Sequence, residues 1–110
     1  MIRNADIPPR FRPGQLVRHV RYGYRGVVVA WDAECQAPES WYHSNRTQPL
    51  RHQPWYHVLV DGSDTTTYAA QDSLDEDLSD LPVRHPLVDT YFDGFAEGTY
   101  QRNQREWLSW

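Results

Sequence analysis

The chain has 110 residues, of which 39% are hydrophobic and 14% aromatic. This composition suits one folded domain with a modest core and excludes a disordered chain. The single cysteine, Cys35, excludes an internal disulfide, and the longest apolar run, Val27–Trp31, is far shorter than the ~20 residues of a membrane span. The first ten residues lack the apolar stretch of a signal peptide, so we expect a soluble, cytoplasmic protein without a membrane partner.

The net charge of −4 is divided unevenly along the chain. Residues 1–57 hold eight arginines and four acids, a net charge of +4, whereas residues 58–110 hold three arginines and eleven acids, a net charge of −8. This asymmetry indicates either a basic face that meets an anion or two halves that neutralise each other on folding. Every cationic side chain except histidine is an arginine, which suits phosphate and base contacts but also follows from genome-wide base composition.

The start of the chain predicts an arm, a turn and a first strand. Pro8-Pro9 blocks regular structure, so we expect a flexible arm over residues 1–10 and one domain over residues 11–110. Pro13-Gly14 predicts a turn, and the short β-prone stretch Gln15–Val20 predicts the first strand.

A second tight turn and a buried strand follow. The two glycines of Tyr22–Gly26 favour a turn or bulge with positive φ, and the apolar run Val27–Asp32 predicts a strand buried on both faces. Residues 33–54 contain three prolines and no period, so this long connection is either functional or disordered.

Two further strands complete a mainly β pattern. Trp55–Val60 alternates its side chains between two faces, and Asp61-Gly62 is a hairpin turn signature that leads into the β-branched stretch Thr65–Ala70. Strands and turns of this kind predict a small, bent, SH3-like β-barrel of about five strands.

The acidic second half predicts a helical extension over residues 72–98. Leucines recur at i, i+4 and i+7 in Asp72–Leu81, which favours one or two helical turns that end at Pro82. A broad apolar stripe after Pro86 predicts a C-terminal helix, stopped by Gly98, that packs on the barrel. The Trp-bearing tail that ends at Trp110 either docks or stays exposed.

Residue patterns for catalysis, metals and cofactors are missing from the sequence. The five histidines and Cys35 fit no zinc spacing, and no activated-thiol context or nucleophile elbow surrounds Cys35. The acidic run Asp72–Asp80 lacks the glycine and terminal glutamate of a calcium loop. We therefore expect no enzyme, no metal and no cofactor.

Basic and aromatic side chains gather instead around the first strand–turn–strand. We predict a DNA contact there, because arginines bind phosphates and aromatic rings stack on bases or wedge into a groove. The alternative is that the tyrosines pack on the end of the barrel and the arginines are only solvated; the pI of 5.6 is low for a nucleic-acid binder. The candidate residues are Arg18, His19, Arg21, Tyr22, Tyr24 and Arg25.

Several motifs across residues 11–75 resemble the YccV-like family of hemimethylated DNA-binding domains, which includes the heat-shock protein HspQ. Residues 34–42 and 85–103 resemble the longer form of the domain found in some F-box proteins. The motifs are Phe11–Gly14, Val17–His19, Tyr24–Val29, Trp31-Asp32, Pro54–Val60 and Thr67–Ala70.

The resemblance implies a bent five-stranded barrel, no catalysis and binding to hemimethylated DNA. HspQ-like members also imply an alternative role as an adaptor that delivers substrates to a Lon-type protease, so a protease or its substrate is the alternative partner. The sequence decides neither the partner nor the oligomeric state. The aromatic and histidine positions that serve the fold or an interaction are Trp41, Trp55, Tyr56, His57 and Tyr68.

Overall fold

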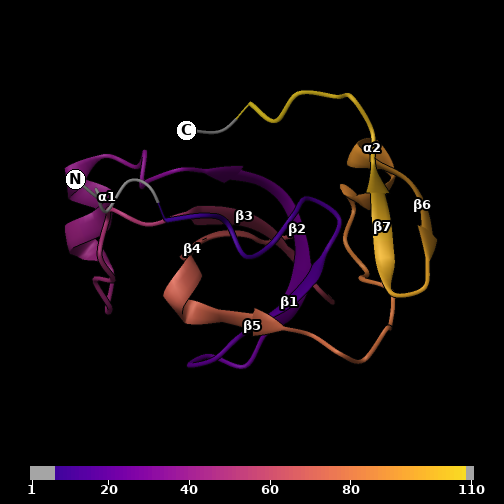
Figure 1. Cartoon of the computed structure of the whole chain (residues 1–110), viewed down its shortest axis with the longest axis horizontal. Helices are drawn as coiled ribbons and strands as arrows, with labels where there is room; N and C mark the ends of the chain where they lie inside the picture. Colours follow the sequence, from indigo (N-terminus) through magenta and orange to yellow (C-terminus); the bar gives the residue numbers. More distant parts are fainter. Residues whose placement is uncertain (1–6, 109–110) are drawn as a thin grey trace.

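The computed structural model describes residues 7–108, which form a five-stranded antiparallel sheet and a separate two-stranded hairpin (Figure 1). The strand order of the large sheet is β4-β3-β2-β1-β5. Its strands are β1 (Leu16–His19), β2 (Arg25–Asp32), β3 (Trp55–Val60), β4 (Thr66–Ala70) and β5 (Leu74–Glu76). The predicted mainly β class and the first four predicted strands are therefore confirmed.

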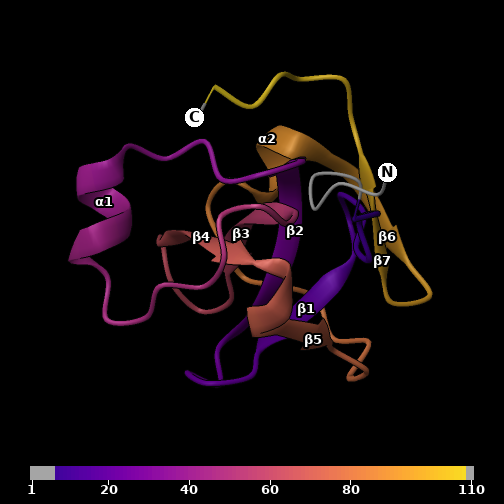
Figure 2. The ribbon, with the colours of Figure 1, turned by 60° about the vertical axis from the view of Figure 1, so that its left-hand side comes forward.

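The remaining elements are short. The hairpin consists of β6 (Phe92–Ala96) and β7 (Thr99–Arg102), and the helical pieces are α1 (Glu39–Ser44), the 3-10 turn η2 (Gln71–Ser73) and α2 (Val88–Tyr91). Figure 2 shows α1 on one side of the large sheet and the hairpin on the other. Among the helices of residues 7–108, none is long and apolar enough to cross a membrane.

The central strand β2 is buried on both faces, as its apolar run predicts. Val28 belongs to a core cluster inside the curved sheet, whereas Val27 and Val29 belong to a second cluster on the opposite face. A bulge between Val28 and Ala30 shifts the register against β3 and increases the local bend. Both faces of β2 are covered, which explains why the residues from Gly26 to Ala30 are all apolar and do not alternate with polar ones.

The two main clusters divide the core by sheet face. The inner cluster is closed by Phe11, which lies against Tyr56 with ring centroids 5.3 Å apart. The Tyr56 hydroxyl accepts hydrogen bonds from the backbone N–H groups of Arg10 and Phe11 and donates one to Gln71. The start of the described chain is thus tied to β3 and η2. The outer cluster holds Phe92 and Tyr100 of the hairpin.

The predicted C-terminal helix over residues 86–98 is wrong. The helix α2 has only four residues, and the chain then folds back as the β6–β7 hairpin. Glu97 and Gly98 both have positive φ, at 54° and 75°, which is the combination that a two-residue hairpin turn requires. The apolar stripe is real, but Phe92 reaches the outer cluster from a strand instead of a helix.

The predicted helix over Asp72–Leu81 is also wrong. Leu74 is 1% exposed, whereas Leu78 and Leu81 are 81% and 59% exposed, so the leucines do not share one buried face. Leu74–Glu76 instead pairs with β1 as β5 and satisfies the backbone groups along that edge. Sheet pairing has overridden the weak helical period of the sequence.

The large sheet is strongly curved, and within residues 7–108 no ladder joins its two edge strands, β4 and β5. The connection over residues 33–54 is ordered around α1 and packs on the sheet through Cys35, Ala37 and Trp41. In the tail, Trp107 packs against His57 and Tyr91 with ring centroids 5.5 and 5.3 Å apart. The predicted contact of Trp110 and most of the predicted arm lie outside the described residues.

Candidate nucleic-acid interface

The β1–β2 turn is held in shape by the side chain of His19. Its Nδ1 atom accepts hydrogen bonds from the backbone N–H groups of Arg21 and Tyr22, at 3.2 and 3.1 Å. Gly23 closes the turn with a φ of 77° and donates its N–H to the His19 carbonyl. The sequence predicted His19 as a DNA contact, but the structure places it 93% buried beneath the turn, where it acts as a scaffold.

The same geometry sets the protonation state of His19. Burial and the nearby Arg21 guanidinium both lower the pKa of His19 below its ordinary 6.5. A proton on Nδ1 would also break both hydrogen bonds from the turn. His19 is therefore neutral at pH 7, and the tip of the turn takes its positive charge from arginine alone.

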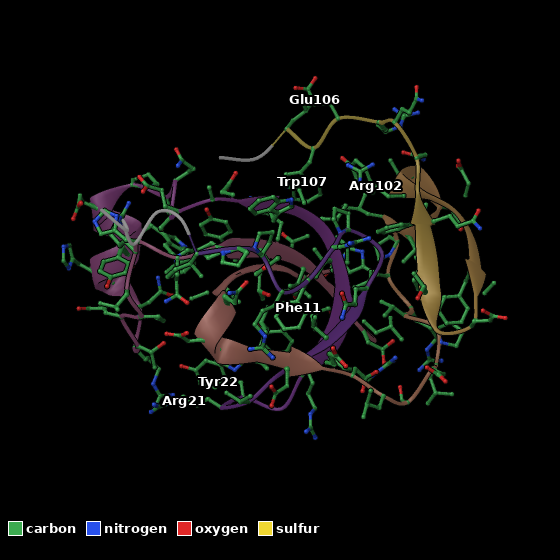
Figure 3. All side chains as sticks on the ribbon, in the orientation of Figure 1. Phe11, Arg21, Tyr22, Arg102, Glu106 and Trp107 are labelled. Carbon is green, nitrogen blue, oxygen red and sulfur yellow. The ribbon has the colours of Figure 1, made fainter. Side chains whose placement is uncertain are left out.

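Arg18, Arg21 and Tyr22 are the exposed members of the predicted set. In the part of the chain that the structure describes, neither arginine forms an ion pair with a carboxylate. Tyr22 is 49% exposed and stacks one face on His19, with ring centroids 4.6 Å apart. Figure 3 shows Arg21 and Tyr22 together at the lower edge of the molecule, far from Glu106 of the tail at its upper edge. The turn therefore presents an aromatic ring supported by His19, with the Arg21 guanidinium 6.0 Å from the centre of that ring.

Arg25 is committed to the protein's own acids. Its Nε donates to Asp77 at 2.9 Å and its Nη1 to Asp61 at 3.1 Å, while the carbonyls of Leu81 and Pro82 accept further hydrogen bonds. Burial alone would lower the pKa of Arg25, but the two carboxylates reverse this and raise it. The side chain joins β2 to the loop after β5, so its geometry is that of a structural ion pair.

Tyr24 connects the turn to the edge strand β4. Its hydroxyl lies 2.9 Å from the Thr67 hydroxyl, and its ring packs on His19 and on the inner core. Burial raises the pKa of Tyr24 above its ordinary value. The contact brings the β1–β2 turn and β4 side by side, although they are more than forty residues apart in the sequence.

A groove with a volume of about 460 Å³ lies between this turn, α1 with its following loop, and β4. Aromatic rings form much of its wall, because Trp41, Trp55 and Tyr68 pack edge-to-face or tilted within 6.2 Å of one another. The predicted aromatic positions Trp41, Trp55, His57 and Tyr68 all line this groove, whereas Tyr56 lies in the inner core.

A buried polar group anchors the floor of the groove. The Tyr68 hydroxyl donates to Asp32 at 2.6 Å and accepts from the Gln36 N–H, and the His57 ring stacks on Tyr68 at 4.4 Å. Burial and the hydrogen bond to Asp32 raise the pKa of Tyr68 far above its ordinary value. Burial lowers the pKa of His57, and Asp32 offsets part of that effect. The floor therefore presents neutral rings at pH 7.

Sequence reasoning missed the far side of the groove. Asn45, Thr47 and Pro49 line it from the loop that follows α1, and the exposed Arg46 lies between the first two. The only signal was the aromatic pair Trp41-Tyr42 inside an otherwise irregular segment. Over residues 7–108, no group of three or more His, Cys, Asp or Glu side chains could hold a metal ion.

Comparison with known proteins identifies the family of this chain. The model of the family described as "Hemimethylated DNA-binding protein YccV like" matches residues 9–99. This chain belongs to the YccV-like family. The match includes the β1–β2 turn, all five strands of the large sheet and the groove.

Curated relatives extend the YccV-like assignment. The proteins named F-box only protein 21 from Homo sapiens, Pongo abelii and Mus musculus are each 37% identical to this chain over 94 residues. The aligned segment covers 82% of this chain but 15% of each relative. The similarity therefore concerns one domain of those longer proteins.

Proposed function

We propose that this chain is a non-enzymatic DNA-binding module, built on an open SH3-like barrel, that contacts DNA through Arg18, Arg21 and Tyr22. The observation that carries the proposal is the pair of exposed arginines without carboxylate partners in the described chain, held beside a half-exposed tyrosine on a rigid turn. Membership of a family described as hemimethylated DNA-binding supports the choice of ligand.

The charges around the turn determine how DNA approaches. Arg18 lies opposite Asp75 in the β1–β5 ladder, and Glu76 follows it on the same exposed strand. These acids repel phosphates along the length of β1, so the DNA backbone meets the tip of the turn. Arg21 therefore makes the stronger phosphate contact and Arg18 the weaker one. Arg25 takes no part, since its guanidinium holds Asp61 and Asp77.

The proposed contact is small, which sets the expected affinity. Two phosphate contacts give a slope of about −2 in a plot of log K against log salt concentration, since each contributes roughly −0.9. The net charge of −4 further weakens binding at low salt. We expect weak binding that is measurable at low salt and lost at moderate salt.

The test measures fluorescence anisotropy of a labelled duplex, hemimethylated or unmethylated, over a salt series. Arg21→Ala should weaken binding to both duplexes and reduce the magnitude of the slope by about 1. Arg105→Ala is the matched control, because Arg105 is also an exposed arginine but precedes Glu106 in the tail. Figure 3 shows Glu106 on the opposite side of the molecule from Arg21 and Tyr22. Equal effects of the two substitutions, or no binding at low salt, would refute the proposal.

A protein-interaction adaptor, such as one that delivers substrates to a Lon-type protease, is the second candidate. The observation that favours it is the exposure of Leu78 and Leu81, which are three residues apart in the loop after β5. Exposed apolar side chains of this kind anchor protein partners. Leu78→Ser with Leu81→Ser should then abolish binding to a purified Lon-type protease and leave DNA binding unchanged. Unchanged protease binding in this variant would refute the proposal that these leucines bind the protease.

A further inference from the structure

The groove between the β1–β2 turn, the α1 loop and β4 adjoins the proposed DNA contact and shares Tyr22 with it, but most of its lining has no part in the phosphate contacts proposed above. Its volume of about 460 Å³ falls within the range of sites for small organic ligands, roughly 300–1,000 Å³. Its rings come from three separate elements, represented by Tyr22, Trp41 and Tyr68. Flat walls of this kind are complementary to a flat ligand.

The charge of the lining narrows the ligand class. No carboxylate and no arginine lines the groove within residues 7–108, and both of its histidines are held neutral at pH 7 by lowered pKa values. A quaternary or methylated ammonium ligand would find no carboxylate in direct contact, because Asp32 lies behind Tyr68 and outside the lining. A phosphate would also find no cation inside. The lining suits a neutral aromatic ring.

Cations lie just outside the groove on two sides. Arg21 adjoins Tyr22 on the β1–β2 turn, and Arg46 lies between Asn45 and Thr47 on the α1 loop. Both arginines are exposed, and neither makes an ion pair in the described chain. A nucleotide within a strand matches this arrangement, because its base is flat and neutral and the phosphates on either side of it are anionic. A proline-rich peptide would fill the rings but would leave both cations without a partner.

The rim offers hydrogen bonds for a base edge. Thr66 and Ser73 are part of the lining, and their side chains carry hydroxyl groups. Asn45 also lines the groove; its amide nitrogen donates to the Trp41 carbonyl, and its amide oxygen remains an acceptor. Tyr22 is the most accessible ring, since His19 supports one of its faces and the side chain is 49% exposed. A base stacked on Tyr22 would extend the stack that His19 begins.

We infer that this groove binds one unstacked nucleobase, with Tyr22 as the stacking surface and Arg21 and Arg46 on the flanking phosphates. The inference rests on the proposed DNA-binding function and adds a nucleobase site in the groove beside the turn, with which it shares Arg21 and Tyr22. Base–aromatic stacking is sequence-tolerant, so the groove favours a displaced or bulged base over a fully paired one.

The experiment compares a perfect duplex with the same duplex carrying one bulged base. The native chain should bind the bulged duplex roughly 5- to 150-fold more tightly, which corresponds to the stacking of one base. Tyr22→Ala should remove this preference, Tyr22→Phe should retain it, and Arg46→Ala should weaken binding to the bulged duplex alone. Trp31→Ala is the matched control, because Trp31 is 38% exposed and lies outside the groove.

The outcomes separate this inference from the proposed function. Equal affinity for both duplexes, with Arg21-dependent binding intact, would overturn the groove inference and leave the DNA-binding proposal standing. Absence of binding to either duplex would refute the proposed function, and NMR titration with a free deoxynucleoside would then decide the groove. Changes in the amide chemical shifts of Asn45 and Thr66 on addition of the nucleoside would support the groove as a nucleobase site. Shifts with a proline-rich peptide but not with the nucleoside would overturn it.

Discussion

Replacement of Arg25 by alanine separates structural arginines from DNA-binding ones. The side chain of Arg25 is 19% exposed and donates to Asp77, which is 11% exposed, and to Asp61, which is 26% exposed. It also donates to two backbone carbonyls of the loop after β5. Arg25→Ala therefore leaves two acids without their cation and releases the loop from β2.

The size of the effect follows from these contacts. A hydrogen bond to a charged group contributes about 1.5–3 kcal/mol, and Arg25 makes two of them to carboxylates. Solvent reaches all three side chains in part, and Asp61 keeps a hydrogen bond from the Arg84 N–H at 2.8 Å. We therefore expect Arg25→Ala to lower the free energy of unfolding by about 2–4 kcal/mol at pH 7.

Urea unfolding followed by tryptophan fluorescence measures this loss. The matched control is Arg18→Ala, because Arg18 is the cross-strand neighbour of Arg25 in the β1–β2 ladder but is exposed. The control should change the free energy of unfolding by no more than about 0.5 kcal/mol. Equal losses in the two variants would refute the assignment of Arg25 to a structural ion pair.

The pH dependence of the free energy of unfolding provides an independent test of the same ion pairs. Burial would raise the pKa of Asp77, but hydrogen bonds from Ser79 and Arg25 lower it; a hydrogen bond from the Arg84 N–H, together with Arg25, lowers the pKa of Asp61. A carboxylate with a lowered folded-state pKa stabilises the fold above its ordinary pKa, here 3.8, and loses that contribution as the pH falls below it. The difference in the free energy of unfolding between the native chain and Arg25→Ala should therefore stay constant from pH 7 to about pH 5 and shrink below about pH 4.

Three further substitutions or titrations test the scaffold. Tyr56→Phe should lower the free energy of unfolding by about 1–3 kcal/mol in urea, because the buried Phe11 N–H loses its partner and Gln71 loses a donor, while the Arg10 N–H keeps its bond to Gln71; no loss would contradict this. An NMR titration of His19 should give a midpoint below 6.5, so stability contributed by its neutral form is lost as the pH falls through 6.5; a higher midpoint would contradict it. Gly26→Ala should lower the melting temperature, since a Cβ would collide with the Leu59 carbonyl; an unchanged one would contradict it.

The strands were predictable wherever local patterning and sheet pairing agree. The apolar run of Val27–Asp32 and the alternation of Trp55–Val60 both survive in the structure, because these strands lie in the middle of the sheet. The second half was misjudged, since leucine spacing in Asp72–Leu81 resembles a helix while the free edge of β1 needs a strand. Glu97-Gly98 forms the turn of the β6–β7 hairpin, but the aromatic stripe before it suggested a helix, for which Gly98 was only the predicted stop.

The candidate site was predictable in composition but not in arrangement. The cluster of basic and aromatic residues near the first turn is local in sequence, so Arg21 and Tyr22 could be proposed directly, and both are exposed on the turn. The partners that hold Arg25 lie 36 and 52 residues further along the chain, and no sequence pattern connects them. The groove brings together residues from β1–β2, α1 and β4, a juxtaposition that only the curvature of the sheet creates.

The most direct test of the central claim is an NMR titration of the isotope-labelled chain with hemimethylated duplex at low salt. The amide chemical shifts should change mainly in the β1–β2 turn, with the largest changes at Arg21 and Tyr22 and little change in the β6–β7 hairpin. Shifts centred on the hairpin or the tail, or an unchanged spectrum, would contradict the claim.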